Sequence, residues 1–117
     1  MQIGHLLAVV HVTDIEVSRA WYAALFGRCE DNNPMPTLVE WQVLPGAWVQ
    51  VFRDPVRAGT DEINVAVDDL ERHIDELRER GLSPGAIAEA NKGVRLSRFP
   101  DPDGNVVSLI GGFRVDY

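Results

Sequence analysis

The stretch Val10-His-Val-Thr-Asp14 leads from an apolar run into an acidic turn, and Val65-Ala-Val-Asp-Asp69 repeats this arrangement later in the chain. In both copies the residues before the aspartate suit a buried β-strand. The residues after it are apolar at helical spacing up to a glycine, Gly27 or Gly81, which can end a helix in the left-handed conformation. The chain is therefore a tandem of two strand-helix modules.

Each expected helix begins at a capping motif. In the first, the Thr13 hydroxyl accepts from a free backbone amide and Glu16, three residues later, reaches back. In the second, Asp68 and Glu71 take these two positions. The expected apolar stripes are Val17, Ala20, Trp21, Ala24 and Leu25 in the first helix and Leu70, Ile74 and Leu77 in the second.

After each helix the apolar residues recur at every second position, which predicts antiparallel strands. These expected strands are residues 38–44, 47–52, 93–98 and 106–110. Pro45-Gly46 joins the first two through a type II turn or a bulged loop, and a run of turn formers at 100–105 joins the last two. Residues 54–61 form a linker, and stretches 30–37 and 83–92 could each hold a short edge strand. The apolar run at residues 6–10 is expected to be a strand covered on both faces.

Composition limits the classes of function. The hydrophobic fraction of 45% and the charged fraction of 25% are ordinary globular values, and neither a membrane segment nor a secretory signal is visible. A formal net charge of -7 makes nucleic acid and anionic membrane surfaces poor partners. The single cysteine, Cys29, cannot form an internal disulfide, so we expect a cytoplasmic protein.

Several motifs occur in the order and spacing of a known superfamily. They are Val12-Thr-Asp14, Trp21-Tyr22, Leu25-Phe-Gly27, Val67-Asp-Asp69, Leu77-Arg-Glu-Arg-Gly81 and Asp101-Pro-Asp-Gly-Asn105. Over nearly its whole length the chain resembles the glyoxalase, bleomycin-resistance and extradiol-dioxygenase superfamily, also called the vicinal oxygen chelate superfamily. The resemblance implies an α+β fold in a single domain spanning residues 1–117. Two tandem βαβββ modules, about residues 1–54 and 61–117, would form a cupped eight-stranded mixed sheet around a cavity. The helices would lie on the convex face of this sheet. The resemblance also implies a homodimer.

The resemblance places four metal-ligand positions at Leu7, Gln50, Glu62 and Ser108. A leucine cannot bind a metal, a serine is a poor ligand and a glutamine offers one neutral carbonyl, so only Glu62 is a good donor. We therefore expect no metal and no other cofactor. A shifted divalent-metal site would need a local bulge that brings His5 toward Gln50 and Glu62.

Since alternate residues of a strand share a face, the residues around the cavity follow from those four positions. The expected ligand-binding residues are Leu7, Val9, Trp48, Gln50, Phe52, Asn64 and Ser108. Two residues are candidates for catalysis: Glu62, if buried, could donate or accept a proton, and His11 could shuttle one. The alternatives are that Glu62 is solvated at the start of its strand and that His11 is a structural histidine.

The favoured hypothesis is a metal-independent small-molecule-binding protein with an apolar, aromatic cavity. It would sequester a compound or assist its chemistry, and planar or aromatic ligands are favoured because Trp48, Phe52 and Trp41 could stack on them. The alternative is a metal-dependent lyase, isomerase or dioxygenase acting on a vicinal-oxygen substrate, with His5, Gln50 and Glu62 as ligands. A third hypothesis, a protein-interaction module, rests on the acidic net charge alone.

Overall fold

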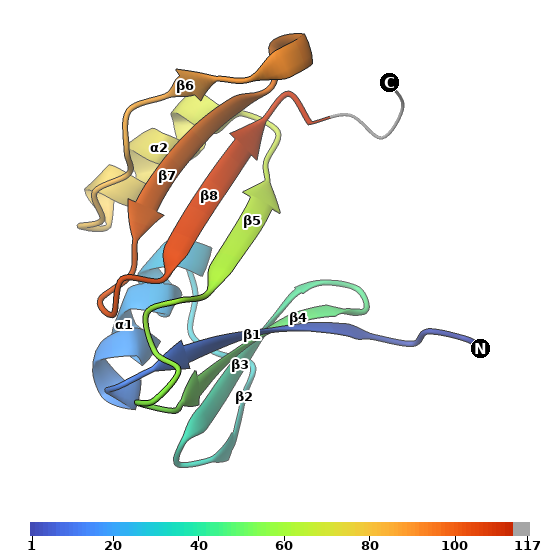
Figure 1. The fold of residues 1–117 in the computed structure, drawn as a ribbon, viewed down its shortest axis with the longest axis vertical. Coiled ribbons are helices and arrows are strands. Elements are labelled where there is room, and N and C mark those ends of the chain that lie inside the picture. Colours follow the sequence, from blue (N-terminus) through green and yellow to red (C-terminus); the bar gives the residue numbers. More distant parts are fainter. Residues whose placement is uncertain (114–117) are drawn as a thin grey trace.

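The computed structural model describes residues 1–113 and contains two modules of the same design, one above the other in Figure 1. The first module consists of β1 (Leu6–Val12), α1 (Ile15–Phe26), β2 (Asn32–Met35), β3 (Leu38–Leu44) and β4 (Ala47–Arg53). The second consists of β5 (Glu62–Ala66), α2 (Leu70–Glu79), β6 (Ala88–Glu89), the 3₁₀ turn η1 (Asn91–Gly93), β7 (Arg95–Pro100) and β8 (Val106–Gly111). The predicted βαβββ repeat is confirmed, including both short edge strands. No described helix is long and apolar enough to span a bilayer.

Each module forms a four-stranded mixed sheet, and the strand order is the same in both. The order is β1-β4-β3-β2 in the first sheet and β5-β8-β7-β6 in the second. The first strand of each module runs parallel to the last, because the helix returns the chain to the end at which it started, and the other neighbours are antiparallel. The strands that lead into the helices, β1 and β5, are therefore edge strands.

Both helices begin one residue later than the capping motifs predict. Asp14, not Thr13, caps α1, and its carboxylate accepts from the amides of the second and third helical residues. Asp69, not Asp68, caps α2. The Thr13 hydroxyl instead donates to a carboxylate oxygen of Asp103 in the second module, at 2.6 Å. A long-range contact has thus taken over the group that a local motif would have used.

The helices cover one face of each sheet, and the hydrophobic core lies between helix and sheet. The predicted stripe of α2 is confirmed. The stripe of α1 is rotated from the prediction, because the buried residues are Ser18, Tyr22 and Leu25 whereas Val17 is exposed. Trp41 is fully buried and its indole N–H donates to a backbone carbonyl at 3.0 Å, so it cannot stack on a ligand.

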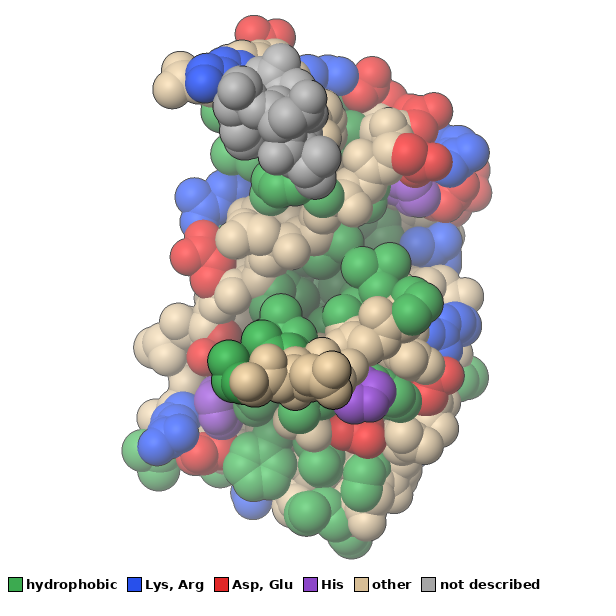
Figure 2. All heavy atoms as spheres, turned by 90° about the vertical axis from the view of Figure 1, so that its right-hand side faces the viewer, with side chains coloured by type: hydrophobic (Ala, Val, Ile, Leu, Met, Phe, Trp, Pro, Cys, Tyr) green, Lys and Arg blue, Asp and Glu red, His purple; other side chains and the backbone are tan. Residues whose placement is uncertain are grey.

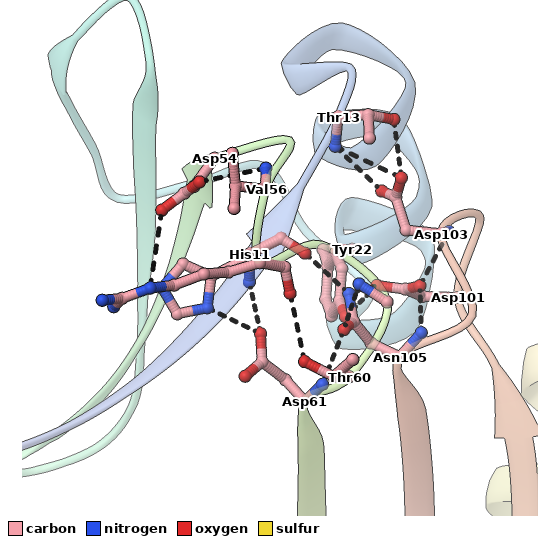
Figure 3. Close-up of polar contacts among 12 residues, drawn as sticks. His11, Thr13, Tyr22, Asp54, Val56, Thr60, Asp61, Asp101, Asp103 and Asn105 are labelled. Carbon is pink, nitrogen blue, oxygen red and sulfur yellow. Dashed lines mark hydrogen bonds and ion pairs between the residues drawn. The ribbon is translucent and has the colours of Figure 1, made fainter.

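A buried polar network joins the two modules (Figure 3). Its centre is Asn105, which follows the β7–β8 turn and is almost fully buried. The side-chain oxygen of Asn105 accepts from the amides of Gly59 and Asp61, and its nitrogen donates to the carbonyl of His11 and to the carboxylate of Asp101. These four bonds use both acceptor lone pairs and both donors of the amide, and they connect β1 and the linker to the turn before β8.

Asp101 extends this network to α1. Its carboxylate accepts from the Tyr22 hydroxyl at 2.8 Å and from the amides of Asp103 and Asn105 at 2.9 Å each. Burial, and next the neighbouring Asp101 charge, raise the pKa of Tyr22, so the hydroxyl remains a donor. The run 100–105, predicted only as a turn, thus anchors the second module to the first.

A second link lies at the far end of α1. Gly27 ends this helix with a φ of 74°, as predicted. Arg80, at the end of α2, donates from its Nε to the carbonyl of Ala24 at 2.5 Å, and its guanidinium would lie only 3.5 Å from a side chain added at Gly27. A cation is favourable at a helix C-terminus, where carbonyl groups lack partners.

Replacing Asn105 by alanine is expected to lower the free energy of unfolding by about 2–4 kcal/mol, because buried groups of both modules lose their partners. Urea denaturation followed by tryptophan fluorescence would measure the change. Asn64→Ala, which removes an exposed amide on β5, is the matched control and should change stability by less than about 0.5 kcal/mol. Equal losses in the two variants would contradict a central role for the network.

Candidate ligand-binding site

The face of the first sheet that points away from α1 carries the predicted ligand-binding residues of the first module. Its members are Leu7, Val9 and His11 of β1 and Trp48, Gln50 and Phe52 of β4, which pair side by side in that order. We call this surface the open face of the first sheet. Leu7 is 51% and Val9 39% exposed, so the expectation that β1 is covered on both faces is wrong. Only the alternate residues of β1, which point toward α1, are covered.

Gln50 is a polar group within this apolar surface. Its Nε2 donates to Oε2 of Glu40 on β3 at 2.7 Å, and Oε1 of Glu40 accepts from Asn32 on β2 at 3.2 Å. Within residues 1–113 no donor reaches the side-chain carbonyl of Gln50. The amide is therefore oriented by its own sheet, and its carbonyl is left as a hydrogen-bond acceptor for a ligand.

His11 is the second polar group of the open face, and Asp61 holds it (Figure 3). The Nδ1 of His11 lies 2.8 Å from Oδ2 of Asp61, and the backbone N–H of His11 donates to the same oxygen at 2.7 Å. The imidazole also meets Phe52 edge to face, with ring centroids 6.3 Å apart and planes at 75°. Both polar side chains are largely buried, at 15% and 25% exposure. The contact gives the ring one orientation at the edge of the aromatic surface.

The second sheet has an open face of a different character. Glu62 is not buried: its side chain is 53% exposed and its carboxylate is ion-paired with Arg98 of β7. The strand β8 lies between β5 and β7, so the ion pair of Glu62 with Arg98 crosses over β8. Arg98 is the register partner of Ser108 on β8. Ser108 itself is 2% exposed, whereas its neighbour Asn64 is exposed. The structure therefore favours the solvated alternative for Glu62.

The four positions that the resemblance assigns to a metal do not fit a metal ion. Leu7 offers no donor atom and Ser108 is buried within its sheet, while the Gln50 amide and the Glu62 carboxylate already have protein partners. His5 precedes β1 and is exposed. Across residues 1–113, no three His, Cys, Asp or Glu side chains are grouped closely enough to hold a metal.

A cleft of about 940 Å³ lies between the two modules, and Figure 2 shows it as a hollow with hydrophobic side chains in its walls. Its walls come from β1, β3, β4, β5, β8 and the two helices, and include Leu6, Ala8, Leu44, Val49, Val65 and Leu77. Of the predicted site residues it contains Trp48, Glu62 and Asn64. Leu6 and Ala8 alternate with Leu7 and Val9, so β1 turns its other side to the cleft, whereas Trp48 of the open face also borders it.

Three partners of the site residues were not predicted from the sequence: Glu40 at Gln50, Arg98 at Glu62 and Asp61 at His11. The alternation of β3 and β7 could have placed the first two on the correct faces, once the hairpin registers were assigned. No local pattern marks Asp61, because it reaches His11 from the linker, 50 residues later in the chain.

Comparison with known proteins identifies the fold. Neither a protein-family model nor a curated protein sequence matches the chain. Among solved structures, it is similar to a glyoxalase/bleomycin resistance protein from Catenulispora acidiphila, with 29% identity and a TM-score of 0.85 over 92% of this chain and 96% of that one. It is also similar to TnmS3, an antibiotic binding protein from a Streptomyces species, with 23% identity and a TM-score of 0.76 over 95% and 98% of the two chains.

A third similar structure is a bleomycin resistance determinant encoded on the transposon Tn5. It is 18% identical, with a TM-score of 0.73 over 92% of this chain and 96% of that one. The likeness extends over nearly the whole of each chain and includes both modules. The chain thus has the tandem βαβββ fold of the glyoxalase/bleomycin resistance proteins, the vicinal oxygen chelate fold that its sequence motifs predict.

Proposed function

We propose that this protein binds small molecules without a metal ion and holds them on the open face of the first sheet. The observation that carries the proposal is the apolar and aromatic surface formed by the exposed Leu7 and Val9 and the half-buried Trp48 and Phe52. An apolar surface with a few oriented polar groups is the usual composition of a ligand site. Two similar structures are described as an antibiotic binding protein and a bleomycin resistance determinant, which supports a binding role.

Planar or aromatic ligands suit this surface best. Trp48 and Phe52 lie four residues apart on the same face of β4, about 13 Å along the strand, with Gln50 between them, so a flat molecule can stack on either ring beside the Gln50 amide. Sequestration requires only this contact. Acid or base assistance would fall to His11, because Glu62 is exposed and ion-paired on the other sheet.

We also propose that the protein is a homodimer, and that a second copy covers the apolar surfaces that one chain leaves open. Leu6 and Leu44 on the walls of the cleft between the modules are 72% and 65% exposed in a single chain.

The inter-module cleft is the surface we assign to the partner copy. Two edge strands, β1 and β5, border it, and Leu6 on its wall is 72% exposed. A strand edge flanked by apolar side chains readily pairs with another chain. The proposed location is the cytoplasm, where the exposed thiol of Cys29 would remain reduced.

The purified protein is expected to contain no stoichiometric divalent metal, because the four family positions do not supply a ligand set. Elemental analysis by mass spectrometry would measure the metal content. Melting temperatures with and without EDTA should agree within about 1 °C, because EDTA changes the stability only if it removes a bound ion. A tightly held ion, lost together with turnover in Glu62→Ala, would instead support the metal-dependent lyase, isomerase or dioxygenase.

Phe52→Ala is expected to weaken the binding of 2-naphthol by about five- to tenfold, because one aromatic contact contributes about 1 kcal/mol. Titration monitored by NMR would give the dissociation constants, and circular dichroism would check folding. Phe113→Ala removes an exposed phenylalanine that lies beyond β8, and it should leave the affinity unchanged. Equal effects of the two substitutions would argue against a ligand site on the open face.

Leu6→Asp is expected to convert the dimer into a monomer, because it places a charge at an apolar interface. The molar mass measured by light scattering after size exclusion should fall from twice the chain mass of 13.0 kDa in the wild type to one chain mass in the variant. Val56→Asp, at a linker residue that is almost fully exposed, should remain dimeric. A monomeric wild-type protein would refute the dimer and leave the small-molecule proposal open to its own test.

A further inference from the structure

We infer that Asp61 is a positioning residue that fixes the tautomer of His11, so that the Nε2 of His11 accepts a hydrogen bond from the hydroxyl of a phenol bound on the open face of the first sheet. The inference rests on the proposed function and specifies the chemistry of the ligand. It is carried by the contact of Asp61 with His11 at the edge of the aromatic surface.

The contact determines which ring nitrogen carries the proton. An ionised carboxylate only accepts hydrogen bonds, so the 2.8 Å contact to Oδ2 of Asp61 places the proton on Nδ1 of His11. In the neutral imidazole the lone pair is then on Nε2. The same carboxylate oxygen also accepts from the backbone N–H of His11 at 2.7 Å. The oxygen is therefore held by the main chain of β1 as well as by the ring.

The backbone of Asp61 is held in turn by the network between the modules. Its N–H donates to Oδ1 of Asn105 at 2.9 Å, and the Nδ2 of Asn105 donates to the His11 carbonyl at 2.8 Å. His11, Asp61 and Asn105 thus form a closed set of contacts, which Figure 3 shows. Supporting hydrogen bonds of this kind keep a binding group in one geometry.

The ring of His11 is also part of the ligand surface. It lies beside Phe52 both in strand register and in ring contact. Within residues 1–113 no hydrogen bond to its Nε2 is present, so that nitrogen is left for a ligand. A phenol fits this arrangement because its hydroxyl lies in the plane of its ring: the ring can stack on Phe52 while the hydroxyl points sideways to His11. A ligand without a donor would leave Nε2 desolvated and unpaired, which costs affinity.

The pair of His73 with Asp68 offers an internal control. The Nε2 of His73 lies 2.8 Å from Asp68, and its Nδ1 lies 3.7 Å from Glu76. Both ring nitrogens of His73 therefore face carboxylates, and neither is left as an acceptor. His73 is on α2 of the second module, where it lines the cleft between the modules and is not part of the open face of the first sheet.

The first test is the tautomer, read from ¹⁵N chemical shifts of the imidazole nitrogens at pH 8. His11 is expected to show a protonated Nδ1 and an unprotonated Nε2 in the wild-type protein. Asp61→Ala removes the oxygen that the Nδ1 and the backbone N–H of His11 share, so the preference for one tautomer is lost, and circular dichroism checks that the variant folds. A proton on Nε2 in the wild type, or shifts that do not change in the variant, would overturn the inference.

The second test compares 2-naphthol with its methyl ether, which has the same rings but no donor. The wild-type protein and the His73→Phe variant should each bind 2-naphthol about tenfold more tightly than its methyl ether. This ratio is expected for one desolvated hydrogen bond. His11→Phe keeps an aromatic ring and should bind both compounds equally, and Asp61→Ala should show a preference of about threefold.

The outcomes separate this inference from the proposed function. If the wild-type protein bound both compounds equally and Phe52→Ala weakened both, the role of His11 and Asp61 would be refuted and the binding function would stand. If neither compound bound to the wild-type protein, both would fail.

Discussion

The buried contacts of Asn105 and Asp101 hold the two modules in one orientation, and the other features of the molecule depend on them. A buried amide or carboxylate without partners costs on the order of 1–3 kcal/mol or more, so the network strongly favours the arrangement in which every bond is made. That arrangement ties β1, α1 and the linker to the turn before β8. Tyr22 contributes because its burial raises its pKa and keeps it a donor to Asp101.

Joining the modules at this end leaves two apolar surfaces uncovered. One is the open face of the first sheet, and the other is the cleft of about 940 Å³ bordered by β1 and β5. Both surfaces share β1, whose alternate residues point to opposite sides. A single edge strand therefore connects the proposed ligand site with the proposed contact to a second copy, and the network that orients this strand also brings Asp61 to His11.

The repeat is preserved in the framework and lost at the site. Asp14 and Asp69 cap the two helices in equivalent ways, and the two sheets have the same strand order. The open faces, in contrast, differ: the first is apolar and aromatic, whereas an ion pair of Glu62 with Arg98 spans the second. Positions that could hold a metal in a symmetric pair of modules hold a leucine and a buried serine here, which is why we propose binding by shape and stacking rather than by coordination.

The sequence by itself determined the βαβββ repeat, the strands and the face to which each strand residue points, because these follow from short-range periodicity and turn chemistry. It also identified the positions where metal ligands are missing. Only the tertiary structure decided what covers each face. Thr13 lost its capping role because it donates to Asp103, Trp41 became core beneath α1, and Glu62 pairs with Arg98, which reaches it from two strands away. These outcomes depend on residues far apart in the chain, as does the contact of Asp61 with His11, and local patterns carry no information about such partners.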